Sequence, residues 1–304
     1  MKIRIATRKS ELALWQANHV ADALRELDDV TQVELVPLTT RGDEVLDRSL
    51  QKIGGKGLFI KELEIAMSQG DADIAVHSMK DVPAEMPEGF CIAAVLARAN
   101  PADALVGNRL DDLQQGARIG SSSLRRQSQL LAIRPDLRIE PLRGNVNTRL
   151  RKLEDGDYDA IVLACAGLER LGRASYITET FSPKQMLPAA AQGVIGIECL
   201  DGRSELQQVL CRLDHATSKV TTSAERAVTG RLQADCQSPV ASYAEVSGSS
   251  LNLQAMVASH DGRQIMREQL SGPVDEPDAL GVRLADKLLD LGAGELLART
   301  GVEE

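Results

Sequence analysis

The sequence is poor in aromatic residues, which make up only 2% of the chain. Proteins that bind single-stranded nucleic acid stack its bases on aromatic side chains, so this scarcity argues against such a platform. Lys and Arg total 35 and Asp and Glu total 44, which gives a net charge of −9. A nucleic-acid partner is therefore not expected unless positive charge is concentrated in one region.

Long apolar runs and paired cysteines are also missing. No stretch reaches the roughly 18 apolar residues that a membrane-spanning helix needs, so no membrane partner is expected. The N-terminal MKIRIATRKS lacks the apolar core of a secretory signal. The 5 cysteines form no CxxC pair, so neither a zinc site nor a redox motif is indicated, and no metal is expected. These absences predict a cytoplasmic protein with reduced thiols.

The chain does contain a repeated pattern of strand, polar turn and helix. Its 304 residues, 43% of them hydrophobic, are enough for two or three globular domains. The matching segments are 4–11 with 118–125, 33–43 with 138–145, and 70–77 with 156–163. The repeat predicts two similar α/β domains, an architecture that commonly traps ligands in the cleft between them.

The domain boundaries follow from the repeat and from a change of pattern after residue 215. We expect domain 1 at 1–97 and 194–214, domain 2 at 98–193, and domain 3 at 215–304. Domain 3 is expected to be α+β: a helix, three strands joined in part by a His260-Asp261-Gly262 hairpin turn, and a closing helix interrupted near Gly292. In domain 1, residues 11–27 predict a helix with His19 packed in the core.

A short apolar strand in the first domain ends abruptly in polar residues. Ile74, Ala75 and Val76 are followed by the run HSMKD, and Pro83 prevents a regular continuation. Open α/β sheets bind their ligands at the edge where such strands end. His77, Ser78, Lys80 and Asp81 are therefore candidate site residues, and the alternative is a solvated loop.

Two further segments suggest how a ligand is held. Residues 42–57 end in GGKG, which lacks the Ser or Thr of a phosphate-binding loop and fits a flexible lid carrying Lys56. Residues 118–152 contain nine basic residues, eight of them arginine, and two acidic ones. Arginine forks grip carboxylates or phosphates in pairs of hydrogen bonds, so this segment predicts a wall for an extended anionic ligand. The alternative is a solvated basic surface.

The motifs together resemble one family along essentially the whole chain. They are DIAVHSMKDVP at 73–83, GGKGLFIKELE at 54–64, SSLRRQ at 122–127, LRGNVNTRL at 142–150, DAIVLACAGLERLG at 159–172 and AERA at 224–227. Taken in this order, they identify the chain as similar to porphobilinogen deaminases, also called hydroxymethylbilane synthases.

The resemblance implies a fold and a reaction. The fold is two α/β domains like those of solute-binding proteins, plus a third small domain with a three-stranded antiparallel sheet and helices. The reaction joins porphobilinogen units head to tail, each losing ammonia, into the linear tetrapyrrole hydroxymethylbilane. A dipyrromethane primer, held by a thioether to one cysteine, remains attached through every turnover. A monomer is implied, with the product passed to a downstream cyclising enzyme.

The resemblance also implies residue roles. Asp81 matches the catalytic aspartate, which assists proton transfer and stabilises positive charge on the pyrrole nitrogen. Cys236, in ADCQSP, matches the attachment cysteine, although Ala234 and Asp235 replace the family's two glycines. The other four cysteines are expected to be buried. The implied cofactor- and substrate-binding residues are Arg8, Lys56, Phe59, Ser78, Lys80, Ser122, Ser123, Arg125, Arg126, Arg143, Asn145, Arg149 and Gln192.

Three rival functions remain at this stage. The duplicated cleft also fits a non-catalytic two-domain module that binds an anion or another solute, or a ligand-sensing regulator. Cys236 also fits a cytosolic thiol enzyme, but no histidine lies near it in sequence to activate it. Incubation with porphobilinogen separates these hypotheses, because only the deaminase releases ammonia and forms a tetrapyrrole.

Overall fold

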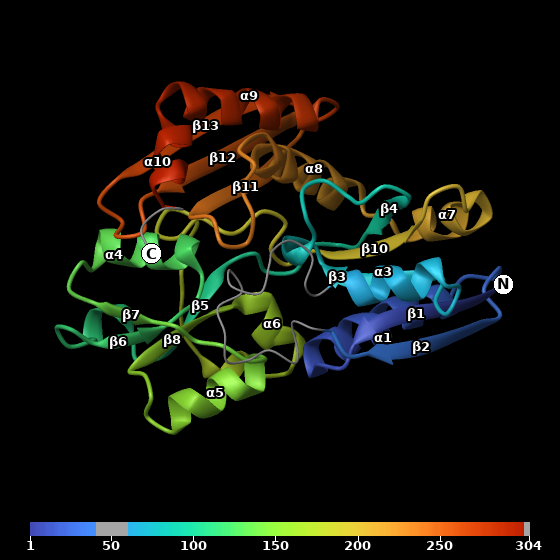
Figure 1. Ribbon diagram of the computed structural model, residues 1–304, viewed down its shortest axis with the longest axis horizontal. Helices are drawn as coiled ribbons and strands as arrows, with labels where there is room; N and C mark the ends of the chain where they lie inside the picture. Colours follow the sequence, from blue (N-terminus) through green and yellow to red (C-terminus); the bar gives the residue numbers. More distant parts are fainter. Residues whose placement is uncertain (41–59, 301–304) are drawn as a thin grey trace. The chain divides into compact units, whose positions relative to one another are not determined.

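The computed structural model describes residues 1–40 and 60–300, apart from the side chain of residue 300. The predicted lid at 42–57, with Lys56, and Phe59 lie outside these residues. The chain divides into two compact units, Met1–Ala99 with Val194–Lys219 and Asn100–Gly193 with Val220–Glu304. Figure 1 shows the helices and strands of both units.

The first unit is built on a five-stranded mixed sheet in the order β2-β1-β3-β10-β4. Neighbours β2, β1 and β3 are parallel, whereas β10 runs antiparallel to both β3 and β4. The strands are β1 (Lys2–Arg8), β2 (Gln32–Leu38), β3 (Ile74–Ser78), β4 (Phe90–Val95) and β10 (Ile195–Leu200). Strand β10 follows residue 194 and pairs with β3, so this part of the chain lies in the first sheet.

Helices cover both faces of this sheet because successive strand residues point to opposite sides. Ile3 and Ile5 pack in one core with α1, whereas Ala6 packs in another with α3. The helices are α1 (Glu11–Arg25), α3 (Lys61–Ser68) and α7 (Ser204–Leu210). Ser10 caps α1 by accepting a hydrogen bond from the Ala13 amide.

The prediction that His19 packs in the core is wrong. His19 is exposed and stacks on Trp15, with the ring centroids 5.1 Å apart. The buried face of α1 lies about one residue further round the helix and includes Gln16, Val20 and Leu24. The buried face therefore contains a polar residue, Gln16, and leaves Trp15 and His19 exposed.

The second unit contains a sheet of the same design, in the order β7-β6-β8-β5-β9. Strands β7, β6 and β8 are parallel, and β5 is antiparallel to β8 and β9. The strands are β5 (Asp103–Gly107), β6 (Arg118–Gly120), β7 (Arg138–Glu140), β8 (Ala160–Ala164) and β9 (Ile177–Thr180). The helices between them are α4 (Leu124–Ile133), α5 (Val146–Glu154) and α6 (Cys165–Arg170).

The two five-stranded sheets match position by position, which confirms the repeat found in the sequence. β6, β7 and β8 correspond to β1, β2 and β3, and β5 takes the place of β10. Each sheet therefore receives its antiparallel fourth strand directly after the chain enters from the other unit, at residue 100 for β5 and at residue 194 for β10.

A three-stranded antiparallel sheet, β11-β12-β13, completes the second unit. Helix α9 lies along one face of it (Figure 1). The elements are α8 (Ala216–Arg231), β11 (Val240–Ser247), β12 (Ser250–Ala258), β13 (Ile265–Pro273), α9 (Pro277–Asp290) and α10 (Ala293–Thr300). The predicted break near Gly292 is confirmed, since this glycine has φ 96° between α9 and α10.

The predicted hairpin turn at His260-Asp261-Gly262 joins β12 to β13, as expected. Gly262 has φ 69°, and a Cβ there would lie 2.2 Å from the Ser128 carbonyl oxygen of α4. Only glycine allows this approach, which holds the hairpin against the neighbouring α/β sheet of the same unit.

The predicted fold class is confirmed by these three sheets. Four 3-10 turns are also present in the described chain: η2 (Met79–Asp81), η3 (Leu110–Asp112), η4 (Ala174–Tyr176) and η5 (Cys211–Leu213). Among the helices of residues 1–40 and 60–300, none combines the length and apolar character that crossing a membrane requires.

Candidate functional site

The turn that carries Asp81 is fixed to the strand beside it. Strand β3 ends at Ser78, and η2 holds Met79, Lys80 and Asp81. The Met79 amide donates to the Val194 carbonyl at 3.0 Å. Gly196 of β10 faces Met79 so closely that a Cβ would lie 2.1 Å from the Met79 sulfur. The missing side chain of Gly196 therefore makes room for this turn.

Asp81 itself is exposed, and in the described part of the chain its carboxylate has no hydrogen-bond or ion-pair partner. Lys80 and Ser78, the other polar residues of the motif, are half-buried. Arg8 lies at the same sheet edge, because β1 is parallel to β3 and ends at Arg8. The first unit thus places Arg8, Ser78, Lys80 and Asp81 at one edge of its sheet.

Two buried polar residues support this edge. The Gln16 amide of α1 donates to the Ser78 hydroxyl at 2.8 Å. His77 Nε2 lies 2.6 Å from Glu198 Oε2 of β10, and neither side chain is more than 5% exposed. Burial raises the pKa of nearby Glu64, and the Glu198 charge adds to this effect. His77 thus makes a buried contact that joins the end of β3 to β10.

In the second unit, the turns after β6 and β7 are joined through one serine. Ser122 Oγ donates to the Leu142 carbonyl and accepts from the Leu142 amide, both at 3.0 Å. Ser123 takes the N-cap position of α4, although its side chain makes no capping hydrogen bond. The turn before α4 and the turn that carries Arg143 are thus held side by side.

The second of these turns presents further basic and polar groups. Arg143 is half-buried, and it has no hydrogen-bond or ion-pair partner among the residues described. Asn145 caps α5 by accepting from the Thr148 amide at 3.0 Å. Arg149 Nε donates to the Gly144 carbonyl at 2.8 Å, which folds this side chain back over the turn.

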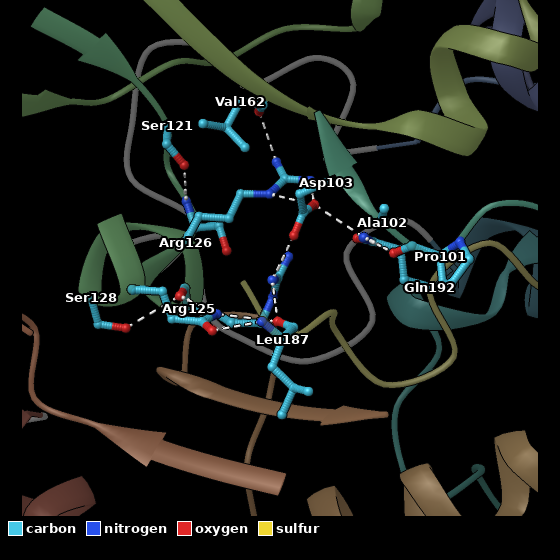
Figure 2. A network of polar contacts seen from close by, with 12 residues as sticks. Pro101, Ala102, Asp103, Ser121, Arg125, Arg126, Ser128, Val162, Leu187 and Gln192 are labelled. Carbon is cyan, nitrogen blue, oxygen red and sulfur yellow. Dashed lines mark hydrogen bonds and ion pairs between the residues drawn. The ribbon is translucent and has the colours of Figure 1, made fainter. Parts of the chain in front are cut away.

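Arg125 and Arg126, by contrast, point into the interior and meet at Asp103 (Figure 2). They are 4% and 6% exposed, and Asp103 is 0% exposed. Arg125 Nη1 and Arg126 Nη2 each lie 2.7 Å from an Asp103 oxygen. Burial alone would raise the pKa of Asp103, but the charges of the two guanidinium groups outweigh it and hold that pKa well below its usual range.

Gln192 joins the same network from the segment before residue 194. Its side-chain amide donates to the Pro101 carbonyl at 2.7 Å and to Asp103 Oδ1 at 3.0 Å. Because Pro101 and Gln192 lie close to the two points where the chain passes between units, this side chain ties the two passages together.

Cys236 is exposed in the loop between α8 and β11. Asp235 Oδ1 accepts from the Gln237 amide at 2.9 Å and from the Ser238 hydroxyl at 3.1 Å. The carboxylate that replaces a family glycine is therefore part of the turn, and its hydrogen bonds stiffen the loop.

The other cysteines are not all buried as expected. Cys165 and Cys199 are buried and Cys91 is intermediate, but Cys211 is exposed at the end of α7. Burial raises the pKa of Cys91 to about 12 and that of Cys165 to about 11. Those two thiols are therefore poor nucleophiles.

Sequence reasoning missed several polar residues of these edges: Gln16, Asp103 and Glu198, which are buried, and Arg170, which is half-buried. Arg170 Nη2 donates to the Gly193 carbonyl at 2.7 Å, and burial lowers its pKa. A signal existed for Asp103 and Glu198, since each is a lone acid in or beside an otherwise apolar strand. Such an acid needs a buried partner.

Comparison with known protein families identifies the family of this chain. The family described as "Porphobilinogen deaminase, dipyromethane cofactor binding domain" matches residues 3–208, and "Porphobilinogen deaminase, C-terminal domain" matches residues 219–290. The chain belongs to the porphobilinogen deaminase family. It is therefore a transferase of tetrapyrrole synthesis that uses a dipyrromethane cofactor.

Curated porphobilinogen deaminases are similar to the chain over nearly its whole length. That of Stenotrophomonas maltophilia (strain R551-3) is 55% identical over 298 residues, 97% of this chain and 98% of the relative. That of Xanthomonas axonopodis pv. citri (strain 306) is 54% identical over 299 residues, with the same coverage.

Solved structures with a similar fold include the periplasmic VFT2 domain of Bordetella pertussis BvgS, at 14% identity and a TM-score of 0.44. The match covers 70% of this chain and 86% of that domain. The probable amino-acid ABC transporter extracellular-binding protein ytmK from Bacillus subtilis is 11% identical, with a TM-score of 0.41 and coverage of 70% and 90%.

Proposed function

We propose that this porphobilinogen deaminase uses Asp81 as its catalytic carboxylate. The observation that carries the proposal is the exposed carboxylate of Asp81, which is held on a fixed turn and has no partner of its own among the described residues. A carboxylate already paired with a protein cation would not serve a cationic substrate. This one is positioned and available.

Asp81 would act while the amine of porphobilinogen departs as ammonia. Its carboxylate would assist the proton transfer to the leaving nitrogen and then stabilise the positive charge that develops on the pyrrole. Lys80 and Arg8, at the same edge, would pair with the acetate and propionate groups of the substrate. Ser78, oriented by Gln16, would add a neutral hydrogen bond.

The residues of the second unit fit a dipyrromethane cofactor. We propose that Cys236, exposed in its loop, forms the thioether, and that Arg125 and Arg143 bind pyrrole carboxylates. The binding surface formed by Arg125 and Arg143 would be supported or completed by Ser122, Ser123, Arg126, Asn145, Arg149 and Gln192. When bound, the cofactor supplies the primer to which substrate units are joined. Lys56 and Phe59 lie outside the described residues, so their binding role stays a prediction.

Three organisational statements also belong to the proposal. We propose that residues 98–193 and 215–304 form two separate domains, because each range has its own sheet and hydrophobic core. We propose that the chain acts as a cytoplasmic monomer and passes hydroxymethylbilane to a cyclising enzyme, with the family resemblance as support. Light scattering on the purified protein would test the monomer.

The decisive experiment has two readouts. Intact-mass measurement under denaturing conditions should show the chain plus one dipyrrole adduct, and digestion should place the adduct on Cys236. Incubation with porphobilinogen should release ammonia and form hydroxymethylbilane. Binding of porphobilinogen without ammonia release would instead favour the non-catalytic solute-binding module. A chain with no adduct would overturn the assignment of Cys236.

A further inference from the structure

Asp103 is a fully buried acid that links three separate segments of the second unit. It is the first residue of β5 and is 0% exposed. Its carboxylate accepts from Arg125 Nη1 at 2.7 Å, from Arg126 Nε and Nη2 at 3.0 and 2.7 Å, and from Gln192 Nε2 at 3.0 Å. Figure 2 shows these side chains reaching Asp103 from different sides.

The cluster holds more positive charge than negative. Two guanidinium groups share one carboxylate, and no other acidic side chain bonds to either arginine within the described chain. Burial lowers the pKa of Arg125, which shows that its charge is costly where it lies. A buried excess charge of this kind is stabilised by one further anion.

The donor atoms show where that anion would bind. Arg125 uses only Nη1, which donates to Asp103 and, at 2.8 Å, to the Leu187 carbonyl. Its Nε and Nη2 have no acceptor among the residues that the structure describes. Arg126 is different, because Nε and Nη2 donate to Asp103 and Nη1 donates to the Val162 carbonyl at 2.9 Å.

The unused Nε–Nη2 edge of Arg125 is one that grips a carboxylate through two parallel hydrogen bonds. An arginine side chain has several rotatable bonds, so this edge is aimed only if the other end of the guanidinium is fixed. Asp103 and the Leu187 carbonyl fix that end. Arg126 and Gln192 in turn hold Asp103.

We propose that Asp103 is a positioning residue of this porphobilinogen deaminase. It holds Arg125 so that the Nε–Nη2 edge receives one acetate or propionate carboxylate of the dipyrromethane cofactor. The cluster then contains two positive and two negative charges. This inference rests on the proposed function, since it takes the ligand to be that cofactor.

The first unit supplies a matched control. Asp73 also pairs with two arginines, with Arg4 Nε and Arg203 Nη1 each 3.0 Å from its oxygens. Those two side chains are 32% and 45% exposed, so water solvates the excess charge there. Removing Asp73 therefore breaks a similar ion-pair cluster without disturbing the Nε–Nη2 edge of Arg125.

The test compares wild type, D103N, D103E and D73N, each produced in a host that makes no porphobilinogen. The melting temperature is measured before and after incubation with porphobilinogen, and intact mass gives the fraction of chains that carry the adduct. The quantity of interest is the rise in melting temperature that the cofactor causes. If Asp103 only stabilised the fold, its substitution would lower both melting temperatures and leave that rise unchanged.

We expect D103N and D73N both to melt below wild type without cofactor. D73N should keep the full rise, whereas the rise in D103N should shrink at least two-fold. D103E keeps the charge but adds one methylene at a fully buried site, so it should melt somewhat below wild type without cofactor and also lose at least half of the rise. If D103N does not fold, D103E decides.

A full rise in D103E, or in a folded D103N, overturns the positioning role. Failure of the proposed function looks different, because wild type itself would then take up no adduct and show no rise. A rise that is lost equally in D73N also overturns the inference, since it would assign the effect to general destabilisation.

Discussion

Asp81 is the residue on which turnover should depend most. We expect Asp81→Asn to fold like wild type, because the exposed side chain makes no hydrogen bond or ion pair with the described residues. Turnover should fall by about 100-fold or more, since the amide neither carries a proton nor balances a cation. Steady-state ammonia release measures the loss, and an unchanged melting temperature is the control. Near wild-type turnover would contradict the assignment.

The ion-pair cluster at Asp73 makes a prediction about acid stability. Burial alone would raise the pKa of Asp73, but hydrogen bonds from Arg4 and Arg203 outweigh it, so the pKa is lowered in the folded state. A lowered pKa stabilises the folded protein above the unfolded value of about 3.9, and the stabilisation is lost as the pH falls below it.

Denaturant unfolding of wild type and Asp73→Asn should show this dependence. We expect wild type to be more stable by about 1.5–3 kcal/mol at pH 7, the range for hydrogen bonds to a charged group. The difference should hold down to about pH 5 and shrink below about pH 4. A difference that stays constant to pH 3 would show that the carboxylate charge is not responsible.

The cysteines allow the thioether to be located chemically. At pH 8 the thiols of Cys91 and Cys165 should resist iodoacetamide, because burial raises their pKa values to about 12 and about 11. In protein without cofactor, exposed Cys211 and Cys236 should be alkylated. In loaded protein only Cys211 should react. Alkylation of Cys236 in fully loaded protein would exclude it as the attachment site.

At the scale of single elements, the fit between β10 and η2 should control activity. In Gly196→Ala the new Cβ would lie 2.1 Å from the Met79 sulfur, so the buried Met79 side chain must shift, and we expect it to displace the turn that carries Asp81. Overpacking of this kind costs about 1–3 kcal/mol of unfolding free energy. We expect kcat to fall beyond what the loss of folded protein explains.

Gly294→Ala is the control for that substitution. Gly294 lies in α10, and the nearest side-chain atom to a new Cβ there is 3.5 Å away. This alanine should leave kcat unchanged and stabilise the helix by up to about 1 kcal/mol. Equal kcat values for the two variants would show that the turn tolerates displacement.

The elements themselves were largely predictable from the sequence because their signals are local. The strand, turn and helix repeat gave the right elements in both α/β sheets, and the hairpin at His260-Asp261-Gly262 contains the glycine that its backbone requires. The buried face of α1 was not predictable, because Gln16 is buried through its hydrogen bond to Ser78, which is distant in sequence.

The site was predictable only in part, because some of its residues come from segments that are distant in sequence. The edge with Asp81 follows from one continuous motif. The network at Asp103 depends on segments that meet only in the folded chain, namely the start of β5, the first turn of α4 and Gln192. No local pattern shows that two arginines of a basic segment turn inward while Arg143 does not.

At the scale of the second unit, Glu225 connects the three-stranded sheet to the segment before residue 194. Its buried carboxylate accepts from the Ala191 amide at 2.6 Å and from the Ala244 amide at 2.7 Å. Ala191 has φ 56°, a left-handed conformation that costs roughly 1–2 kcal/mol for a residue other than glycine. The bond to Glu225 helps to hold it there.

Glu225→Ala should therefore destabilise the whole unit. Two buried amides would lose their acceptors, at about 1–3 kcal/mol each, and the melting temperature should fall by about 2–4 °C for each kcal/mol. Glu245→Ala, an exposed residue of β11, should change the melting temperature little. Calorimetry compares the two variants, and equal melting temperatures would contradict a connecting role for Glu225.

The late position of β10 in the sequence sets the order in which the two five-stranded sheets can be completed during translation. When residue 99 has left the exit tunnel, the first sheet still lacks β10, whose residues 195–200 are synthesised only after the complete second five-stranded sheet. Until then β3 and β4 have no strand between them, and their edges are open to wrong pairing. The first-made half of this enzyme must therefore wait for the second, so a nascent chain arrested before residue 195 should be a chaperone client.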